Sequence, residues 1–172
     1  MEEIFEIVNE DGTVIGHALR SECHGNPALL HRTVHVLVIN EQGDVWLQKR
    51  SAQKDIQPGK WDTSVGGHVA VGETILDAVG RETQEEIGIE TTDFEPCFTY
   101  TIRNDIESEL TATFRHFVKN DTIINFNPDE ISEGRFWSAG EIADKLGKQV
   151  FTPNFEQEWQ RYTLWKQEHD KM

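Results

Sequence analysis

One short segment limits what this chain can fold into and what it can do. Residues 66–90, GGHVAVGETILDAVGRETQEEIGIE, combine the end signals of a helix with five glutamates and an aspartate. Thr74 followed by Asp77 has the spacing of a capping box, and Gly88 stands where a left-handed cap ends many helices. The segment therefore predicts a helix from about residue 75 to residue 86, with loops before and after it.

The two sides of this predicted helix differ in chemistry at about 100° per residue. The predicted buried stripe consists of Leu76, Val79, Thr83 and Ile87. Glu82, Glu85 and Glu86 share a neighbouring arc, where carboxylates repel one another and oppose the helix dipole. A divalent cation such as Mg²⁺ would offset this repulsion, because it prefers oxygen ligands. The alternative is an ordinary solvated acidic face.

Composition narrows the possible partners. The 172 residues include 31 acidic and 16 basic side chains, for a formal net charge of −15. We therefore expect neither a nucleic-acid polymer nor a membrane as partner, and any phosphorylated ligand must be met by local positive charge or a cation. The length predicts a single domain over residues 1–172. Two cysteines, and a start without signal-peptide features, predict a cytoplasmic protein.

The remaining pattern predicts a mixed α+β fold. Residues 4–19 alternate around Asp11-Gly12 and predict an N-terminal β-hairpin, followed by a loop over residues 21–30. Further strands are predicted at residues 33–40, 45–50, 61–69, 98–103, 110–118 and 134–138, the third of them broken at the glycine pair. The segments 33–40 and 45–50 should form a second hairpin. A short helix follows, and Thr152-Pro153 opens a C-terminal helix whose aromatic residues should face the core.

Residues 67–89 resemble the Nudix box of the Nudix hydrolase superfamily. The matching positions are Gly67, Glu73, Arg81, Glu82, Glu85, Glu86, Gly88 and Ile89. The resemblance implies an α/β/α sandwich that holds Mg²⁺ or Mn²⁺ and hydrolyses the diphosphate of a nucleoside diphosphate derivative or a similar small molecule. Thr83 replaces an aliphatic residue of the family pattern, and its place on the buried stripe affects packing more than chemistry.

The resemblance also implies a role for each charged position of the box. Glu82, Glu85 and Glu86 would be metal ligands, with Glu85 or Glu86 as the alternative general base. Glu73 and Arg81 would pair to orient the site. The metal would neutralise charge on the phosphoryl group and lower the pKa of a bound water, which explains how so acidic a chain could bind a diphosphate.

A second resemblance covers about residues 20–140 and concerns isopentenyl-diphosphate isomerase, a Nudix-fold enzyme. It implies a metal site at His24, His31, His68, Glu107 and Glu109. It also implies diphosphate contacts by Arg50 and Lys54. However, Gly66 stands where the isomerase carries its protonating cysteine, and this chain keeps box glutamates that the isomerase lacks. We therefore expect a hydrolase; the alternatives are an isomerase-like enzyme and a non-catalytic nucleotide-sensing module.

Several of these residues also have ordinary structural interpretations. His24 and His31 could be surface or packing residues, and Glu107 and Glu109 could form a charged sheet edge instead of supplying a base. Glu130 and Glu133, which precede a predicted strand, are rival bases. His35, inside an apolar strand, is expected to be a hydrogen-bonded core residue. The N-terminal hairpin and the aromatic C-terminal helix could provide the surface of a homodimer.

Overall fold

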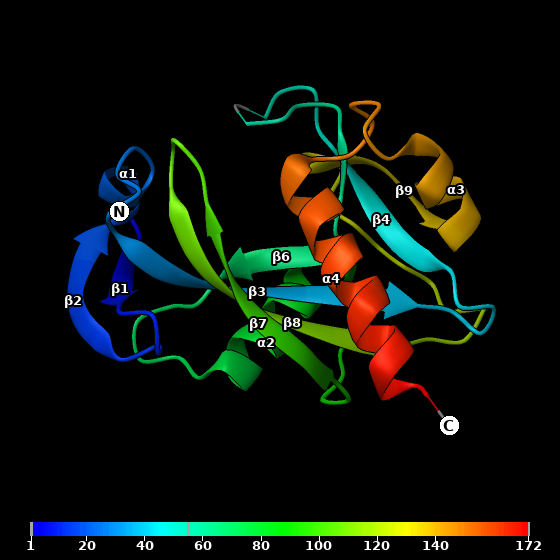
Figure 1. Ribbon diagram of the computed structural model, residues 1–172, viewed down its shortest axis with the longest axis horizontal. Helices are drawn as coiled ribbons and strands as arrows, with labels where there is room; N and C mark the ends of the chain where they lie inside the picture. The colour runs from blue at the N-terminus through cyan, green and yellow to red at the C-terminus, as the bar shows by residue number, and fades with distance from the viewer. Residues whose placement is uncertain (1, 55, 172) are drawn as a thin grey trace.

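The computed structural model describes residues 2–54 and 56–171, which form a curled mixed sheet with helices on both faces (Figure 1). The strands are β1 (Ile4–Val8), β2 (Val14–Leu19), β3 (Leu30–Ile39), β4 (Val45–Arg50), β5 (Trp61–Asp62), β6 (Val65–His68), β7 (Glu95–Arg103), β8 (Ser108–Phe117) and β9 (Ile131–Trp137). The helices are α1 (Arg20–Cys23), α2 (Ile75–Ile87), α3 (Ala139–Lys145) and α4 (Pro153–His169). The predicted N-terminal hairpin and C-terminal helix are both present.

Strand β3 organises the sheet. One of its edges pairs in parallel with β8 along its whole length, from Leu30 opposite Ser108 to Ile39 opposite Phe117. Its other edge pairs in turn with β1 at His31, with β6 at residues 33–36 and with β4 at residues 38 and 39. The predicted second hairpin is therefore short, because β4 leaves β3 after two pairs and continues against β5 and β9.

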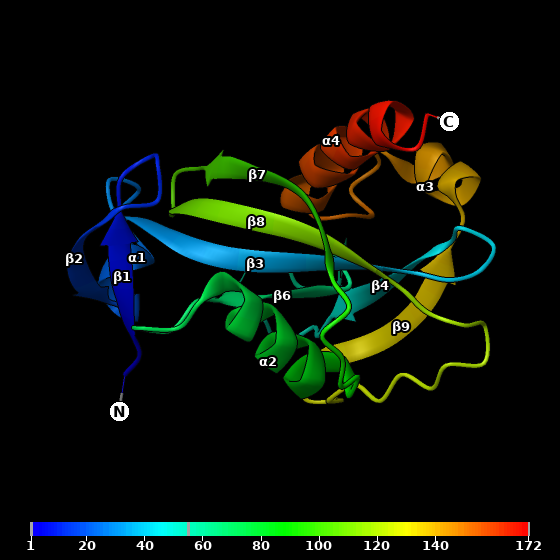
Figure 2. The same ribbon diagram turned by 90° about the horizontal axis from the view of Figure 1, so that it is seen from below.

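Two apolar cores lie on the two faces of the sheet, which explains why β3 is apolar on both sides. Val34, Val36 and Val38 join a cluster with the buried side of α2. Leu37 and Ile39 face the other way and join a cluster with the aromatic side chains of α4. Figure 2 shows α2 on one face of the sheet and α3 and α4 on the opposite face. The prediction that the aromatic residues of α4 face the core is confirmed.

Helix α2 has the predicted ends but not the predicted orientation. The Thr74 hydroxyl accepts a hydrogen bond from the Asp77 N–H at 3.1 Å, and Gly88 ends the helix at φ 69°. The prediction that Leu76 belongs to the buried stripe is wrong, because 64% of this residue is exposed. Ile75, about 100° around the helix, packs against the core instead. The buried face of α2 is thus turned toward its glutamates.

Two further predictions were wrong in detail. Residues 20–23 form the short helix α1, where a loop was expected. The predicted strand 61–69 is interrupted at residues 63 and 64, whereas both glycines lie inside β6 and pair with β3. Ser64 explains the break, because its hydroxyl accepts a hydrogen bond from the Val38 N–H at 2.9 Å and is thereby tied to the sheet.

Among the described helices, none combines the length and apolar character needed to cross a membrane.

Candidate active site

A cleft of about 920 Å³ lies where β4 and β6 separate along the edge of β3. Nine of the predicted site residues line it: His24, Arg50, Lys54, His68, Glu82, Glu85, Glu86, Glu107 and Glu109. Of the other three, His31 and Arg81 contact Glu109 and Glu82 of this set, and Glu73 forms an ion pair with Arg81. Residues from the two resemblances are therefore brought into one cavity.

The carboxylate of Glu82 occupies the space beside Gly67. A Cβ atom at Gly67 would stand 2.1 Å from the Cδ atom of Glu82, a distance that no side chain could tolerate. On the next turn, Glu86 accepts a hydrogen bond from the Gln48 amide at 3.0 Å. Glycine at position 67 thus lets Glu82 approach the sheet and enter the cleft next to Glu86.

The environment of Glu82 and Glu86 disfavours the ionised form of both carboxyl groups. The pKa of Glu86 is raised to about 8, mainly by burial; the hydrogen bond from Gln48 opposes this shift, and the neighbouring Glu82 adds to it. Burial also raises the pKa of Glu82 above its usual range. A bound cation would reverse this trend, since it favours the ionised form of both groups. Glu85 differs from this pair, because 59% of its side chain is exposed.

Arg81 connects this helix to the loop before it. Its guanidinium donates to both oxygens of Glu73, at 2.8 Å and 2.9 Å. It also donates to Glu82 at 2.8 Å, to Glu85 at 3.2 Å and to the carbonyl oxygen of His68 at 3.0 Å. The hydrogen bonds from Arg81 hold the pKa of Glu73 below its usual range. Arg81 therefore fixes the position of Glu82 relative to β6.

A second group of candidate ligands, which we call the His–Glu cluster, comprises His24, His31, His68, Glu107 and Glu109. It draws on the end of α1, on β3, on β6 and on the start of β8. The Nε2 atom of His24 lies 3.1 Å from a carboxylate oxygen of Glu107. Those of His31 and His68 each lie 3.6 Å from one oxygen of Glu109. The three histidines offer ligand atoms within 4.8 Å of one another.

The His–Glu cluster fits a metal ion. Among the described residues, the Nε2 atoms of its three histidines and one oxygen of Glu107 are buried and have no hydrogen-bond partner. Leaving such groups unsatisfied costs roughly 1–3 kcal/mol each. Burial lowers the pKa of His68 to about 3, which keeps its imidazole in the neutral form that binds metals. Three imidazoles with two carboxylates are a donor set that suits transition metals.

Packing around the His–Glu cluster fixes the histidine rings. Phe5 stacks on His68 with ring centroids 4.4 Å apart and on His31 at 5.2 Å. The Nδ1 atom of His31 lies 3.4 Å from the carbonyl oxygen of Leu29, an arrangement that directs Nε2 toward the cluster. The N-terminal hairpin thus supplies one wall of this site.

The predicted substrate contacts, Arg50 and Lys54, both reach the cleft with partners. The Nε atom of Arg50 donates to the carbonyl oxygen of Ile56 at 2.9 Å, and its Nη1 atom lies 3.6 Å from Asp62. Lys54 is hydrogen-bonded to Glu130. Of the two rival bases on this side, Glu130 lines the cleft and the exposed Glu133 does not.

Sequence reasoning missed that His35 belongs to the cleft. Its predicted hydrogen-bond partner exists, since Nδ1 lies 2.7 Å from a carboxylate oxygen of Glu158, but its ring also lines the cavity. A signal was available, because His31, Thr33 and His35 lie two residues apart on one face of β3. Gln48, which orients Glu86, carried no such signal.

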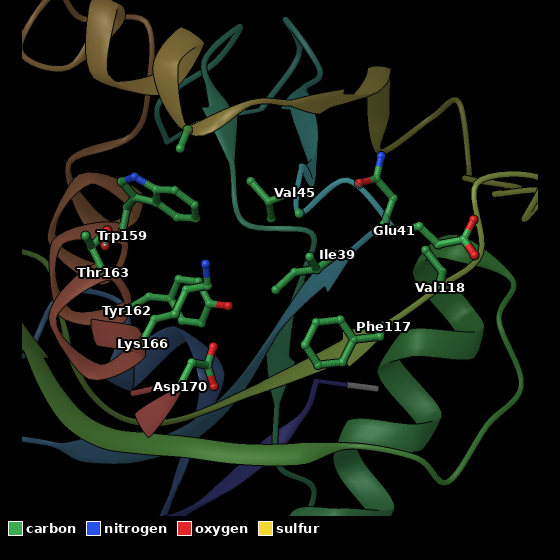
Figure 3. Close-up of a pocket in the computed structure, with 13 residues that line it drawn as sticks. Ile39, Glu41, Val45, Phe117, Val118, Trp159, Tyr162, Thr163, Lys166 and Asp170 are labelled. Carbon is green, nitrogen blue, oxygen red and sulfur yellow. Dashed lines mark hydrogen bonds between the residues drawn. The ribbon is translucent and has the colours of Figure 1, made fainter. Parts of the chain in front are cut away.

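A second cavity of about 420 Å³ lies at the other end of the sheet, between α4 and the turn from β3 to β4 (Figure 3). Trp159 and Tyr162 of α4 face Ile39 and Val45 across it, with Phe117 at one side. None of the predicted site residues lines it. The predicted site residues are therefore gathered in and beside the large cleft.

Comparison with known proteins agrees with this geometry. The family described as NUDIX domain matches residues 29–155. The chain belongs to the Nudix family. The matched residues contain the Nudix box and every predicted site residue except His24. The curled mixed sheet with helices on both faces is accordingly the Nudix fold.

Individual relatives fall on both sides of the hydrolase and isomerase division. An isopentenyl-diphosphate Delta-isomerase of Streptomyces griseus is 31% identical over 156 residues, covering 88% of this chain and 79% of the relative. A Nudix hydrolase of Deinococcus radiodurans is 32% identical over 140 residues, covering 78% of each chain. The crystal structure of DR0079 from the same organism matches 93% of this chain and 99% of its own, with 27% identity and a TM-score of 0.77.

Proposed function

We propose that this Nudix protein is a metal-dependent hydrolase that cleaves the diphosphate linkage of a nucleoside diphosphate derivative or a similar small organic diphosphate. The observation that carries this proposal is the pair of partly buried carboxylates, Glu82 and Glu86, which lie side by side in the cleft, with Glu82 next to Gly67. Such a pair is costly without a cation, and hard cations with oxygen ligands are typical of sites that handle phosphates.

In this proposal Glu82, Glu85 and Glu86 hold Mg²⁺ or Mn²⁺. When bound, the ion neutralises charge on the phosphoryl group and lowers the pKa of a coordinated water. Arg81, braced by Glu73, keeps Glu82 in place. Gln48 does the same for Glu86 on the opposite side.

The remaining roles belong to groups at the cleft surface. Arg50 and Lys54 supply positive charge for the diphosphate, since both line the cleft. A carboxylate accepts the proton of the attacking water. Glu85 and Glu86 are the candidates within the Nudix box, and the rival bases that also line the cleft are Glu107, Glu109 and Glu130. Within the box, Glu85 is the more exposed of the two, whereas Glu86 is engaged with Gln48. Water is the nucleophile and a phosphate-containing fragment leaves.

An isomerase-like activity is the second candidate, because the His–Glu cluster is fully assembled and relatives include isomerases. Gly66 weighs against it, since glycine has no side-chain proton to transfer. A side chain there would also crowd its neighbours, because a Cβ atom at Gly66 would lie 3.2 Å from the ring of His35. We therefore place hydrolysis first.

A substrate panel tests the proposal. Nucleoside diphosphates, nucleotide sugars, dinucleotides, coenzyme A and prenyl diphosphates would be incubated with the protein in Mg²⁺ and in Mn²⁺. We expect metal-dependent release of a phosphate-containing product from at least one class. Glu86→Gln should lower kcat/KM by more than about 100-fold, because loss of a ligand should exceed the effect of losing an outer-shell partner. Glu90→Gln, an exposed carboxylate of the same segment, is the matched control.

Four outcomes would contradict this proposal. Turnover without metal, or turnover unchanged in Glu86→Gln, would exclude the mechanism. Conversion of a prenyl diphosphate to an isomer without release of phosphate would favour the isomerase. Saturable binding of nucleotides with no turnover on any class would favour a sensing module.

A further inference from the structure

The unassigned feature of the cleft is a histidine held from behind by a buried carboxylate. His35 projects from β3, and its Nδ1 atom lies 2.7 Å from Glu158 of α4. Glu158 is fully buried, and the same oxygen accepts from Thr113 at 2.9 Å and from Tyr100 at 3.3 Å. Three donors from three strands therefore fix this carboxylate, and the carboxylate fixes the imidazole.

The other side of the ring faces the cleft. The Nε2 atom of His35 has no hydrogen-bond partner in the described part of the chain, and 13% of the side chain is exposed. A Cβ atom at Gly66 would lie 3.4 Å from Nε2 and 3.2 Å from Cδ2. Because residue 66 is glycine, it has no side chain that could cover this edge of the ring.

The charges in the cleft distinguish His35 from the basic side chains around it. The basic side chains around it already have acidic partners: Arg81 with Glu73, Lys54 with Glu130 and Arg50 with Asp62. Burial alone would lower the pKa of His35, but the charge and hydrogen bond of Glu158 outweigh it and raise the pKa to about 9. The charges of Glu109 and Asp62 also raise the pKa of His35. The imidazole is thus a cation at neutral pH.

We propose that His35 contacts the substrate, donating its Nε2–H to a phosphate oxygen of the diphosphate, and that Glu158 is a positioning residue that acts through it. This inference rests on the proposed diphosphate hydrolysis. The Nδ1 side of the charged ring is bound to Glu158, and its Nε2–H is free to donate to an anionic oxygen. Such charge-assisted hydrogen bonds are stronger than those between neutral groups. The glycine at position 66 leaves room for this contact.

Binding of inorganic pyrophosphate in the presence of Mg²⁺ tests the contact by calorimetry. His35→Gln should weaken binding by about 10-fold or more, as expected for a lost hydrogen bond to a charged group. Gly66→Ala should weaken it similarly, since the new methyl group would cover the ring edge while His35 and Glu158 remain. His17→Gln, an exposed histidine on β2, is the matched control and should bind as the wild type does.

The role of Glu158 must be tested by a measurement that a general loss of structure would not affect in the same way. In ¹⁵N spectra of the wild type, pyrophosphate should shift the Nε2 resonance of His35. In Glu158→Gln, the midpoint of the His35 titration should fall toward the ordinary histidine value of about 6.5. An unchanged midpoint would overturn the positioning role.

The contact and the hydrolase can fail separately. If the wild type hydrolyses a diphosphate while His35→Gln binds pyrophosphate equally well, the contact is wrong and the hydrolase stands. If no diphosphate is hydrolysed but pyrophosphate binding still depends on His35, the hydrolase is wrong and the contact stands. Absence of saturable pyrophosphate binding to the wild type would overturn the contact.

Discussion

The two groups of candidate ligands in the cleft are built in different ways. Glu82 and Glu86 lie one turn apart on helix α2, and each is held by a neighbour, Arg81 in one case and Gln48 in the other. The His–Glu cluster draws its members from four separate segments of the chain. Its His31 and His68 stack on Phe5, and four of its ligand atoms are buried with no hydrogen-bond partner among the described residues.

Because of this difference, the two groups of candidate ligands in one cavity should prefer different metal ions. The helix offers only oxygen ligands, which suit Mg²⁺, whereas the His–Glu cluster offers mostly imidazole nitrogen, which suits transition metals. The helix site is destabilised by charge when empty, since burial raises the pKa of Glu86. The cluster is destabilised by unsatisfied hydrogen bonding. Each site can therefore be disrupted without removing residues of the other.

The helix site can also be disrupted strongly without changing a ligand. In Gly67→Ala, the new Cβ would stand 2.1 Å from the Cδ atom of Glu82, so the Glu82 side chain must shift from its position beside β6. We expect kcat/KM for the substrate found in the panel to fall by about 100-fold. Overpacking should also lower the free energy of unfolding by about 1–3 kcal/mol. Enzyme kinetics and urea denaturation measure the two effects.

The control for this variant is Gly16→Ala on β2, where an added Cβ would meet nothing within 4 Å. It should keep wild-type turnover. Zn²⁺ binding at the His–Glu cluster should be retained in both variants. Equal loss of activity in the two alanine variants, or normal activity in Gly67→Ala, would contradict the importance of the contact between Gly67 and Glu82.

The complementary disruption removes one histidine of the His–Glu cluster. His24→Ala should weaken Zn²⁺ or Mn²⁺ binding at the cluster by more than about 10-fold, while Mg²⁺-dependent turnover changes less. In the wild type, Zn²⁺ at 100 times its Kd should raise the free energy of unfolding by about 2.7 kcal/mol, and His24→Ala should lose that gain. Thermal unfolding with and without Zn²⁺ measures this difference.

Crystals soaked with Mn²⁺ or Zn²⁺ give a direct check of the same site. Anomalous density is expected between His24, His31 and His68, whose ligand atoms lie within 4.8 Å of one another. Absence of density there, with stability unaffected by Zn²⁺, would leave the His–Glu cluster as a packing feature. His17→Ala is the control for nonspecific histidine binding.

The helix site could be predicted from the sequence because its signals are local. Thr74 and Gly88 mark the ends of α2 through contacts within a few residues. The rotation of the helix could not be predicted, since it depends on which side chains the sheet accepts, and Leu76 was therefore misplaced. The His–Glu cluster was predicted only through a family resemblance, because no spacing rule connects His31 to Glu109.

His35 shows the limit of sequence reasoning in this fold. Its partner Glu158 is 123 residues away, and the two meet only because α4 packs across β3. The parallel pairing of β3 with β8 has no local signal either, since it joins strands far apart in the chain. Contacts of this kind depend on tertiary packing. They determine the positions of cleft residues, such as His35, that lie outside the Nudix box.

Acid titration of the metal-free protein should separate the two sites. The pKa of Glu86 is raised to about 8 from 4.5, so the folded state binds this proton more tightly and stability rises as the pH falls from about 8 to about 4.5. The pKa of His68 is lowered to about 3 from 6.5, so its contribution is lost as the pH falls from about 6.5 to about 3.

Urea denaturation in EDTA between pH 5 and pH 8 measures these slopes. Glu86→Gln should flatten the gain in stability between pH 8 and pH 6.5, and His68→Gln should reduce the loss below pH 6.5. Added Mg²⁺ should flatten the first slope in the wild type, because it favours the ionised carboxylates. Parallel profiles for all three proteins would show that neither group controls stability in this range.

The smallest effect is expected at the one position where the Nudix box departs from its family pattern. Thr83 is fully buried on α2, and its hydroxyl donates to the carbonyl oxygen of Val79 at 2.7 Å. That carbonyl also lies in the helical hydrogen-bond ladder, so Thr83→Val removes a satisfied hydroxyl without leaving an orphan. The free energy of unfolding should change by less than about 1 kcal/mol, and kcat/KM should stay at the wild-type value. Thr83→Ala should cost more stability, because it leaves a cavity. A large loss of turnover in Thr83→Val with unchanged stability would mean that packing under the helix controls the carboxylates as strongly as Gly67 does.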